Sequence, residues 1–462
     1  MDNRVVALMR VAQKHCSVGV RRFRLKMVCD APSIGTARID RIAPTTTLRL
    51  QAGADRAVRV LILNQCFYPD VVATAQHGWD LALHLRKEGH EVTAIASRSI
   101  YGAKGASLAK HEVVQGVRIE RVSASIFGKS SILARACDFL FFYILALWRA
   151  LTLPKHDVCV VFTTPPFISL ASWILRLIRG TRYVYWVMDL YPDVPVVCGV
   201  MRKDSLATRF FEGVNRFCLR RADRVVVLGR CMESLVLSKG IPASKLVRIN
   251  VWSDQEEIKP IARETNAYRR EWNVGDRLLV MYSGNFGIGH DIETMADGVT
   301  QLASDPRILF AFVGGGKRKP ELIDLLKSRG VTGFIDAPYQ PRERLDELLS
   351  AADVHLASLK NGAEGVMVPC KLYGVLAAGR PVVYVGSPSG EVARVIAEEH
   401  CGAVVPCGDS ARFIEAILGY ANDRASVDAD GARGRAALTE KWGASHALAK
   451  WSTLLGEIAA RT

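Results

Sequence analysis

The sequence contains no apolar run that could cross a membrane. A spanning helix needs about 18 to 20 consecutive apolar residues, and the longest uninterrupted apolar run, Phe139 to Trp148, has ten. The 11 cysteines include no Cys-x-x-Cys pair and have no regular spacing, so they indicate neither a disulfide scaffold nor a structural zinc site. These absences argue against a multi-span membrane protein and favour a reducing compartment, the cytoplasm.

The composition also lacks the signs of a disordered or low-complexity chain. Of the 462 residues, 49% are hydrophobic and 23% are charged, with 37 glycines and 18 prolines. Such a chain can bury a sizeable core, and at roughly 150 residues per domain its length predicts two larger or three smaller domains.

The positive charge is distributed unevenly. The net charge is +15, and residues 1–57 hold 11 Lys and Arg against 4 Asp and Glu, a net of +7. This segment lacks the apolar core and the small-residue cleavage site of a secretory signal. Two interpretations remain open: a disordered leader or misassigned start, and a basic tail attracted to anionic lipid or nucleic acid.

Beyond this segment we expect two series of alternating strands and helices. Val58–Leu63, apolar except for Arg59, is typical of a buried strand, and Thr74–Lys87 has the apolar spacing of a helix. After a linker-like polar stretch, 253–273, a second series begins at Leu278. Continuous apolar strands alternating with helices predict an α/β fold of two doubly wound, Rossmann-like halves, with ligands bound in a cleft at the carboxyl ends of the strands. Further strands are expected at 92–96, 159–162, 183–187, 224–228, 308–313, 333–335, 354–357, 381–385 and 403–405.

Two glycine-rich segments follow strands in the second half. Gly284-Asn285-Phe286-Gly287 joins a strand to a helix, and Gly314-Gly315-Gly316-Lys317 ends another strand in the same way. Glycines let the backbone approach a ligand, and a helix N-terminus favours an anion. A tight turn would explain either loop alone, but two such loops on one sheet favour a diphosphate between them.

A third segment leads from Glu364 into an Ala-rich helix that ends at Gly379. Lys371 lies in the first turn of this helix, where the helix dipole disfavours a cation. It either serves a bound anion or is an ordinary solvated lysine.

Together these motifs support a family resemblance. The two glycine loops and the segment Glu364…Pro369-Cys370-Lys371-Leu372-Tyr373-Gly374…Gly379-Arg380-Pro381 resemble the donor half of GT-B glycosyltransferases of retaining family 4. The resemblance is closest to the bacterial exopolysaccharide and O-antigen branch, which includes L-fucosamine-type transferases, and it covers about residues 58–460. Supporting matches in the first half are Thr164-Pro165-Pro166, Asp189-Leu190-Tyr191-Pro192-Asp193, Leu228-Gly229-Arg230-Cys231-Met232 and Trp252-Ser253-Asp254.

The resemblance implies a division of labour along the chain. Residues 1–57 form the basic leader, 58–252 an acceptor-binding domain with membrane-facing helices, and 253–440 the domain that binds a nucleotide-sugar donor. Residues 441–462 form a C-terminal helix that can pack back on the first half.

The donor half departs from the family pattern. Family members carry two glutamates separated by seven residues, and these positions are Val366 and Gly374 here, with Glu364 two residues before the first. The usual Arg and Lys after the first glycine loop are missing, which leaves His290, Lys317 and Lys371 to face the diphosphate.

The acceptor half departs as well, because the histidine often found before an acidic residue is Met188 here and Asp189 is the polar residue that remains. We interpret these changes as the character of a subfamily. The resemblance then implies catalytic roles for Asp189, Glu364 and Lys371. Donor binding is assigned to Gly284, Asn285, Phe286, Gly287, His290, Gly315, Lys317, Gly365, Val366 and Lys371.

No metal ion or other cofactor is expected. Asp189 and Asp193 are four residues apart with Pro192 between them, and the histidines share no ligand spacing. The charge on the leaving group must then be met by lysines, backbone N–H groups and helix dipoles.

The first half also has apolar segments bordered by basic residues. The run from Phe139 to Trp148 is too short to span a bilayer, and 173–179 repeats the apolar and basic combination. A core helix would explain the run, but the repetition favours a helix lying on a membrane surface. Acceptor and membrane contacts are assigned to Thr74, Phe139, Phe142, Leu145, Trp148 and Arg149, and contacts with anionic lipid to Arg209, Arg216, Arg220 and Arg221.

The expected function is a retaining glycosyltransferase of hexosyltransferase type. It would move a sugar from a nucleotide-diphosphate donor to a saccharide linked to undecaprenyl diphosphate or a similar lipid, at the inner face of the cytoplasmic membrane, during synthesis of exopolysaccharide, O-antigen or capsule. One alternative is a nucleotide-sugar 2-epimerase-like enzyme, which has no use for an apolar and basic surface. The other is a non-enzymatic membrane or nucleic-acid binding protein, although no nucleic-acid module is recognisable.

Overall fold

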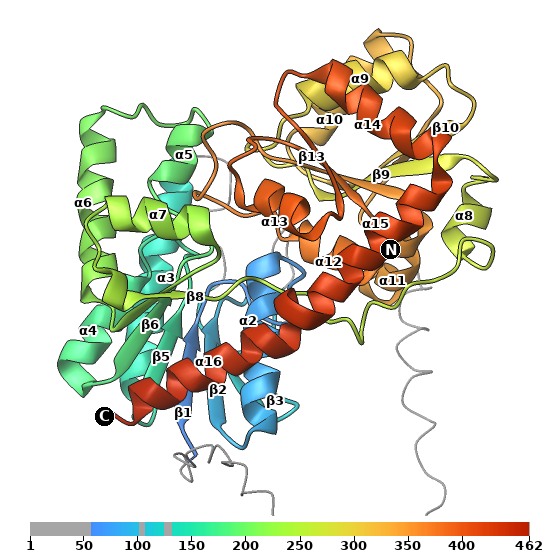
Figure 1. The fold of residues 1–462 in the computed structure, drawn as a ribbon. Helices are drawn as coiled ribbons and strands as arrows, with labels where there is room; N and C mark the ends of the chain where they lie inside the picture. The colour runs from blue at the N-terminus through green and yellow to red at the C-terminus, as the bar shows by residue number, and fades with distance from the viewer. Residues whose placement is uncertain (1–56, 101–106, 124–131, 462) are drawn as a thin grey trace, which may run out of the picture. The chain divides into compact units, whose positions relative to one another are not determined.

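The computed structural model describes residues 57–100, 107–123 and 132–461. The basic leader of the sequence lies outside this range except for residue 57. The described chain contains two sheets, each packed with helices (Figure 1).

The first sheet is built from the apolar runs of the first half. Its strand order is β3-β4-β2-β1-β5-β6-β7-β8, and every neighbouring pair is parallel except β3 and β4. The consecutive residues Leu61, Ile62 and Leu63 are all buried; because side chains alternate between the faces of a strand, both faces of this sheet are covered. The strands are β1 (Arg59–Leu63), β2 (Glu91–Ala96), β3 (His111–Val114), β4 (Val117–Arg121), β5 (Val158–Val161), β6 (Arg182–Trp186), β7 (Arg224–Val227) and β8 (Leu246–Arg248).

The helices of this half connect its parallel strands. Two of them have clear local end signals: Gly180 ends α4 in a left-handed conformation (φ 69°), and the Ser205 side chain caps α6 by accepting from the Thr208 N–H. The helices are α2 (Ala73–Lys87), α3 (Ile132–Thr152), α4 (Ser169–Arg179), α5 (Asp193–Val197), α6 (Leu206–Arg221) and α7 (Arg230–Ser238), followed by a 3₁₀ turn at Ala243–Lys245.

The second sheet is entirely parallel in the order β11-β10-β9-β12-β13-β14. Alternate residues of β9 enter different cores: Val280 packs with residues of α9 and α14, and Met281 with residues of α8 and α11. Helices therefore cover both faces, and the predicted doubly wound architecture is confirmed. The strands are β9 (Leu278–Asn285), β10 (Ile308–Gly315), β11 (Phe334–Ala337), β12 (Val354–Ser358), β13 (Val382–Val385) and β14 (Gly402–Val405).

Among the helices of the second half, α14 begins after Asp409, whose side chain caps it by accepting from the Arg412 N–H (2.9 Å). The helices are α8 (Ala267–Glu271), α9 (Glu293–Leu302), α10 (Lys319–Ser328), α11 (Leu345–Ala351), α12 (Lys371–Ala377), α13 (Glu391–Glu399), α14 (Ser410–Asn422), α15 (Arg424–Ala437) and α16 (Ala444–Ala459), with a 3₁₀ turn at Arg342–Arg344 and a π-helical turn at Leu438–Trp442.

The last helix, α16, packs on the first half of the chain. Trp451 is fully buried, with its ring centroid 4.5 Å from that of Trp186 in β6. Ser452 Oγ lies 2.9 Å from His84 Nε2 of α2. Figure 1 shows α16 lying beside α2 and running past the strands of the first sheet.

Some elements differ from the sequence-based expectation. The antiparallel hairpin β3–β4 was not predicted, and neither was β8. The polar stretch 253–273 is more than a linker, because it contains α8, in which Asn266 caps the helix by accepting from the Arg269 N–H (3.1 Å) and Tyr268 is buried.

Candidate active site

The two glycine loops meet at the carboxyl ends of β9 and β10. Gly314 lies opposite Gly284 in the parallel register, and the Phe286 N–H donates to the Gly315 carbonyl (2.7 Å). Gly314 has φ 116°, and a β-carbon there would lie 2.1 Å from the Gly284 oxygen, so the close approach of the two strands requires glycine. The sequence thus brings two backbone turns to one sheet edge. Asn285 is exposed there, and Phe286 is buried.

Lys371, the first residue of α12, reaches toward this edge. Its Nζ lies 3.3 Å from the ring centroid of Tyr282 in β9 and is shielded from solvent, without a hydrogen-bond partner among the described residues. A β-carbon at Gly284 would lie 3.8 Å from the same atom. Burial lowers the pKa of Lys371 well below its usual value. A desolvated amine beside a glycine turn is suited to an anionic ligand.

His290 is not the cation that the sequence suggested. Its Nδ1 lies 2.6 Å from the Ser358 carbonyl, to which it donates. Burial, together with the nearby charge of Lys371, lowers the pKa of His290 to about 3. The imidazole is therefore neutral at physiological pH, and its Nε2 is the atom that can accept a hydrogen bond.

Two basic residues that follow the second glycine loop hold it in place. Arg318 donates to the His290 carbonyl (2.8 Å) and pairs with Glu293 and Glu321. Lys319 donates to the Gly314 carbonyl (2.9 Å) and pairs with Asp336. Lys317, which the sequence assigned to the diphosphate, is exposed, whereas Arg318 and Lys319 are buried. Sequence reasoning missed Arg318, although it adjoins a residue that was singled out.

The loop that carries Glu364 packs against the first half. Glu364 Oε2 accepts from the Gly362 N–H (2.7 Å). Gly365 has φ 77°, and a β-carbon there would lie 2.5 Å from the Cys231 carbonyl oxygen. The Val366 N–H donates to the Ala363 carbonyl (3.1 Å). A turn of the loop therefore uses this N–H, and the assignment of Val366 to donor binding stays a prediction.

Asp189 lies beside the same loop from the other side. It forms an antiparallel bridge with Met367, and the neighbouring Leu190 N–H donates to the Val366 carbonyl (2.9 Å). Burial raises the pKa of Asp189 to about 6. Burial raises the pKa of Cys370, the residue directly before Lys371, and the negative charge of Asp189 raises it further. The structure therefore brings Asp189 near the segment that carries Glu364 and Lys371.

Comparison with known proteins accounts for this arrangement. A family model described as "Glycosyl transferase 4-like domain" matches residues 73–252, and one described as "Glycosyl transferases group 1" matches residues 277–423. WbjE of Pseudomonas aeruginosa, named as a probable glycosyltransferase, is 33% identical over 272 residues, which cover 57% of this chain and 66% of that protein. The chain is a glycosyltransferase of the GT-B fold.

Further similarities of this glycosyltransferase are to a bacterial protein named for polysaccharide synthesis and to solved structures of the same fold. WcaI of Escherichia coli K12, named for a proposed role as a glycosyl transferase in colanic acid biosynthesis, is 24% identical over 70% of this chain and 82% of its own. The fold is similar to that of sucrose-phosphate synthase from Thermosynechococcus elongatus (TM-score 0.72, 17% identity, 87% of this chain and all of that one). It is also similar to that of Anabaena HepE in complex with UDP-glucose (TM-score 0.64, 14% identity, 88% of this chain and all of that one).

The family matches set aside the epimerase and the non-enzymatic alternatives.

Within the described part of the glycosyltransferase, no group of three or more His, Cys, Asp or Glu side chains is placed to hold a metal ion. The expectation that the reaction needs no metal stays a prediction.

The apolar run of the enzyme lies in α3, but its exposed face differs from the one expected. Phe142 is fully buried, and Phe139 and Leu145 are partly buried. The assignment of Phe142 to a membrane face is therefore wrong. The side chains that do face solvent are Leu140, Phe141, Ile144 and Trp148, the last 60% exposed.

Two other residues of the proposed acceptor side are also placed. Arg149 donates to the buried Glu120 carboxylate (2.9 and 3.1 Å), so its charge is used inside the first half and not at a membrane. Thr74 lies in the first turn of α2, partly buried, and its carbonyl accepts from Asn64 Nδ2 (3.4 Å).

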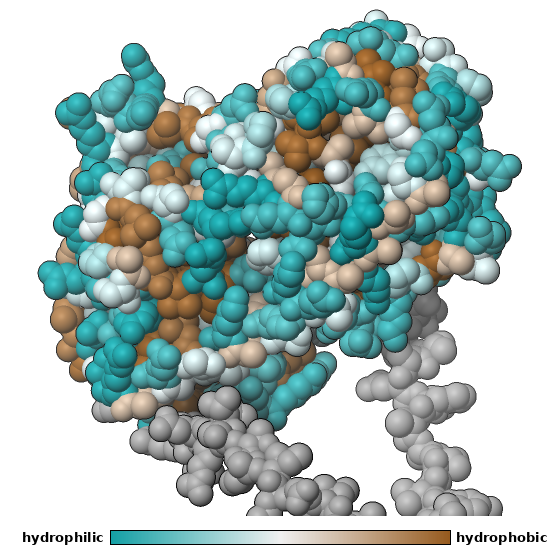
Figure 2. Space-filling model, viewed as in Figure 1, coloured by the Kyte–Doolittle hydropathy of each residue, from teal (hydrophilic) through white to brown (hydrophobic). Residues whose placement is uncertain are grey.

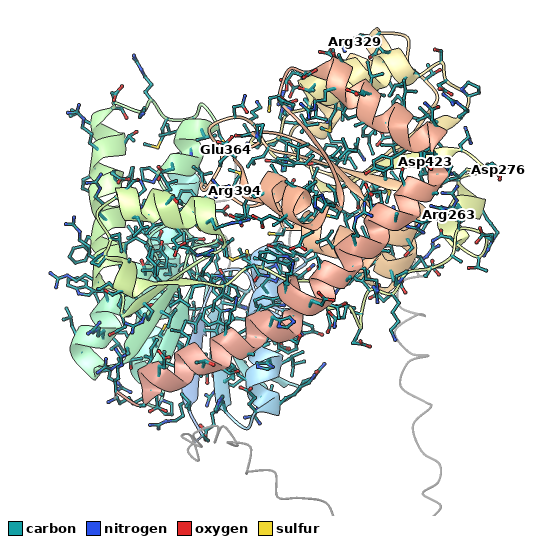
Figure 3. All side chains as sticks on the ribbon, viewed as in Figure 1. Arg263, Asp276, Arg329, Glu364, Arg394 and Asp423 are labelled. Atoms are coloured by element: carbon teal, nitrogen blue, oxygen red, sulfur yellow. The ribbon has the colours of Figure 1, made fainter. Side chains whose placement is uncertain are left out.

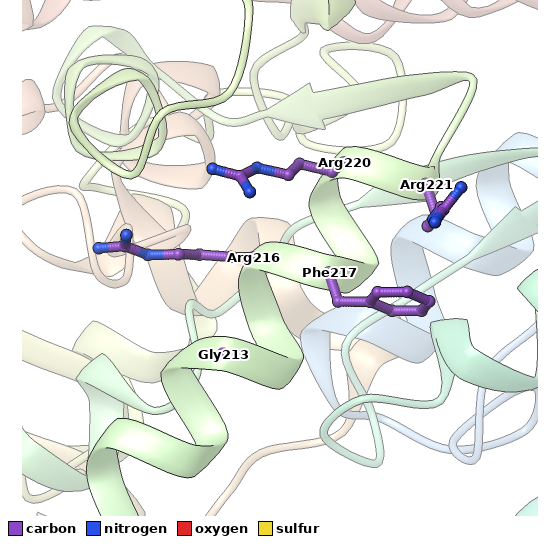
Figure 4. A pocket seen from close by; sticks show the side chains of 5 residues that line it. All are labelled: Gly213, Arg216, Phe217, Arg220 and Arg221. Atoms are coloured by element: carbon purple, nitrogen blue, oxygen red, sulfur yellow. The ribbon is translucent and has the colours of Figure 1, made fainter.

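The exposed apolar face of α3 continues onto neighbouring helices. α4 contacts both α3 and α6, and it exposes Leu177 and Ile178, while α6 exposes Leu206 and Phe210. Figure 2 shows hydrophobic surface on the side where α4 and α6 lie. An open pocket of about 490 Å³ on α6 is lined by Gly213, Arg216, Phe217, Arg220 and Arg221 (Figure 4). Among the described residues, no helix is both long enough and apolar enough to span a bilayer.

Proposed function

We propose that the enzyme is a retaining glycosyltransferase that transfers a sugar from a nucleotide-diphosphate donor to a lipid-linked saccharide of undecaprenyl diphosphate type. It would act at the inner face of the cytoplasmic membrane, in synthesis of exopolysaccharide, O-antigen or capsule. The observation that carries the donor assignment is the amine of Lys371, shielded from solvent without a hydrogen-bond partner beside the glycine turn at Gly284.

The donor diphosphate is proposed to lie between this turn and Lys371. The glycines give phosphate oxygens access to backbone N–H groups, and Lys371 supplies charge in a desolvated place, where it acts strongly on a phosphate. The related fold of HepE in complex with UDP-glucose supports a nucleotide-sugar at a site of this kind. Glu364 would accept hydrogen bonds from hydroxyls of the sugar, and the exposed Lys317 would bind a phosphate.

The acceptor is proposed to enter from the side of Asp189. In a retaining enzyme without a protein nucleophile, an oxygen of the donor phosphate helps to deprotonate the acceptor hydroxyl. Asp189 would then orient that hydroxyl or stabilise the positive charge that develops at the anomeric carbon. Its position against the loop of Glu364 supports this role.

Membrane binding is proposed to occur through the exposed apolar residues of α3, α4 and α6 together with the arginine pocket. Apolar side chains bordered by arginines suit an anionic bilayer surface, where both kinds of group gain free energy. The role of WcaI in colanic acid biosynthesis, as its name gives it, is consistent with an acceptor carried by a lipid.

The donor site is tested by replacing Lys371 with Ala. Loss of one preorganised charge is expected to cost about 2–4 kcal/mol of transition-state stabilisation, measured as kcat/KM after a screen of nucleotide-sugars for hydrolysis. Lys327→Ala, an exposed lysine of α10, is the matched control and should keep wild-type activity. Equal kcat/KM in wild type and Lys371→Ala would reject the site.

A further inference from the structure

One buried carboxylate joins the two halves of the enzyme. Glu391, the first residue of α13, is 8% exposed. Its Oε2 accepts from the backbone N–H groups of Arg230 (2.6 Å) and Cys231 (3.3 Å), at the start of α7 in the first half. Its Oε1 accepts from Arg230 Nε (3.0 Å). A carboxylate at a helix N-terminus with a guanidinium partner is a strong, charge-assisted arrangement.

The residue before α7 leaves room for this carboxylate. Gly229 has φ −176°, an extended conformation that any residue adopts. The constraint on position 229 is therefore steric: a β-carbon there would lie 2.7 Å from the carboxyl group of Glu391. Gly229 and Glu391 are 162 positions apart in the sequence, yet the lack of a side chain at Gly229 makes room for the Glu391 carboxylate.

The same contact borders the loop of Glu364. Gly365 packs against the carbonyl of Cys231, whose own N–H bonds to Glu391. Cys231 Sγ donates to the Ser389 carbonyl (3.3 Å), two residues before Glu391. A β-carbon at Gly390, the residue before α13, would lie 3.6 Å from Glu364 Cγ. Glu364 and Arg394 of α13, both labelled in Figure 3, act electrostatically on the Cys231 thiol. The start of α7 is thus the surface on which the loop of Glu364 and the start of α13 rest together.

We propose that Glu391 is a positioning residue: its carboxylate docks on the start of α7 and so fixes the loop of Glu364 against Asp189. This inference rests on the proposed roles of Glu364 and Asp189. In this role Glu391 acts on the reaction only through the loop.

The first test needs no substrate, so it is independent of the proposed donor site. Hydrogen exchange is followed by mass spectrometry in two peptides, 228–236 and 361–368, in wild type and Glu391→Gln. The amide keeps the shape of the side chain but loses its charge. Both peptides are expected to lose protection together, with the β9 strand unchanged. Unchanged protection of peptide 361–368 in the Gln variant would overturn the proposal.

A second pair of variants separates this contact from general destabilisation. Gly229→Ala puts a methyl group where the carboxylate lies, and it should loosen both peptides as Glu391→Gln does. In a Glu391→Ala background the methyl group has room, so Gly229→Ala should add less than a twofold change in exchange rate. Additive effects of the two substitutions would count against a shared contact.

The link to catalysis is tested by comparing the effects of a substitution on kcat and on KM. Glu391→Gln is expected to lower kcat of sugar transfer about tenfold and to change KM for the donor less than twofold, because the proposed phosphate contacts lie elsewhere. Glu398→Gln is the control: Glu398 also pairs with Arg230, but it is 47% exposed, and exposed pairs contribute little. An unchanged kcat in the folded Glu391→Gln variant would remove the catalytic role.

Discussion

At the scale of single residues, the site is defined by two groups whose burial works against their charged forms. Lys371 Nζ is held over the Tyr282 ring, and the carboxylate of Asp189 is desolvated beside Met367. Burial lowers the pKa of the lysine and raises that of the aspartate. Titratable groups whose pKa values are shifted in this way are typical of functional sites.

Binding of a nucleoside diphosphate is expected to be coupled to proton uptake by Lys371. A phosphate within hydrogen-bond distance raises the pKa that burial has lowered, so at a pH between the free and bound values the lysine gains a proton on binding. Affinity should therefore fall as the pH rises through this window. Calorimetry with UDP and GDP in buffers of different ionisation enthalpy measures the uptake, and Lys371→Met should abolish it. The same buffer dependence in wild type and Lys371→Met would place the proton elsewhere.

Asp189 is expected to set the acidic limb of the pH–rate profile. Because its pKa is raised to about 6, Asp189 is mainly a carboxylate above this pH and mainly protonated below it. Well below pH 6, kcat/KM should therefore fall about tenfold per pH unit. Asp189→Asn should lower transfer at least about tenfold, or ~1.4 kcal/mol, and leave membrane binding intact. An Asp189→Asn enzyme with wild-type rate and the same acidic limb would show that Asp189 is only a turn residue.

At the scale of elements, α3 shows how a uniform apolar run divides between core and surface. Phe142, Ala146 and Ala150 recur every fourth residue on the buried face, and Leu140, Ile144 and Trp148 recur every fourth residue on the exposed face. The buried face packs on the first half. The exposed face has no covering element among the described residues.

Charged substitutions on the two faces of α3 are expected to have opposite consequences. Ile144→Glu should release the protein from vesicles containing anionic lipid without lowering its melting temperature, because this side chain is 57% exposed. Phe142→Asp should instead unfold the protein, since it places an unpaired charge in the core. Vesicle co-sedimentation and thermal unfolding measure the two effects. Val113→Glu, on exposed β3, is the control and should still sediment; full binding by Ile144→Glu would reject this face as the membrane contact.

The sequence predicted those elements whose signals lie within a few neighbouring residues. The buried strands are visible as apolar runs, and Asp409 marks a helix start by side-chain chemistry that acts within a few residues. The orientation of α3 could not be predicted, because ten apolar residues in succession carry no polar position to mark the solvent side. The hairpin β3–β4 was missed because only part of it is buried.

The same limit applies to the site. The glycine loops and Lys371 were found from sequence because each adjoins a strand or helix end. The neutral state of His290 and the pairing of Arg149 with Glu120 depend on partners 68 and 29 residues away, which no local pattern shows. The match between Glu391 and Gly229 was missed for the same reason, since the two residues are 162 positions apart in the sequence.

At the scale of the whole molecule, the last helix ties the end of the chain to its first sheet. Trp451 is fully buried against Trp186, and Arg182 of β6 donates to the Arg461 carbonyl (2.5 Å). Trp451→Ala is expected to cost about 3–5 kcal/mol of stability, as for large buried aromatic residues, measured by chemical denaturation. Lys450→Ala, an exposed neighbour on the same helix, should change stability by less than about 0.5 kcal/mol. A loss below about 1 kcal/mol in Trp451→Ala would mean that α16 is not part of the folded unit.

The central claim is that the second half holds a nucleoside diphosphate between the Gly284 turn and Lys371. A crystal structure of the enzyme with UDP or GDP tests it most directly. The account predicts a phosphate oxygen about 2.7–3.2 Å from Lys371 Nζ and from a backbone N–H of residues 284–287. A nucleotide bound with its phosphates away from Lys371, and with the lysine still covered by Tyr282, would contradict it.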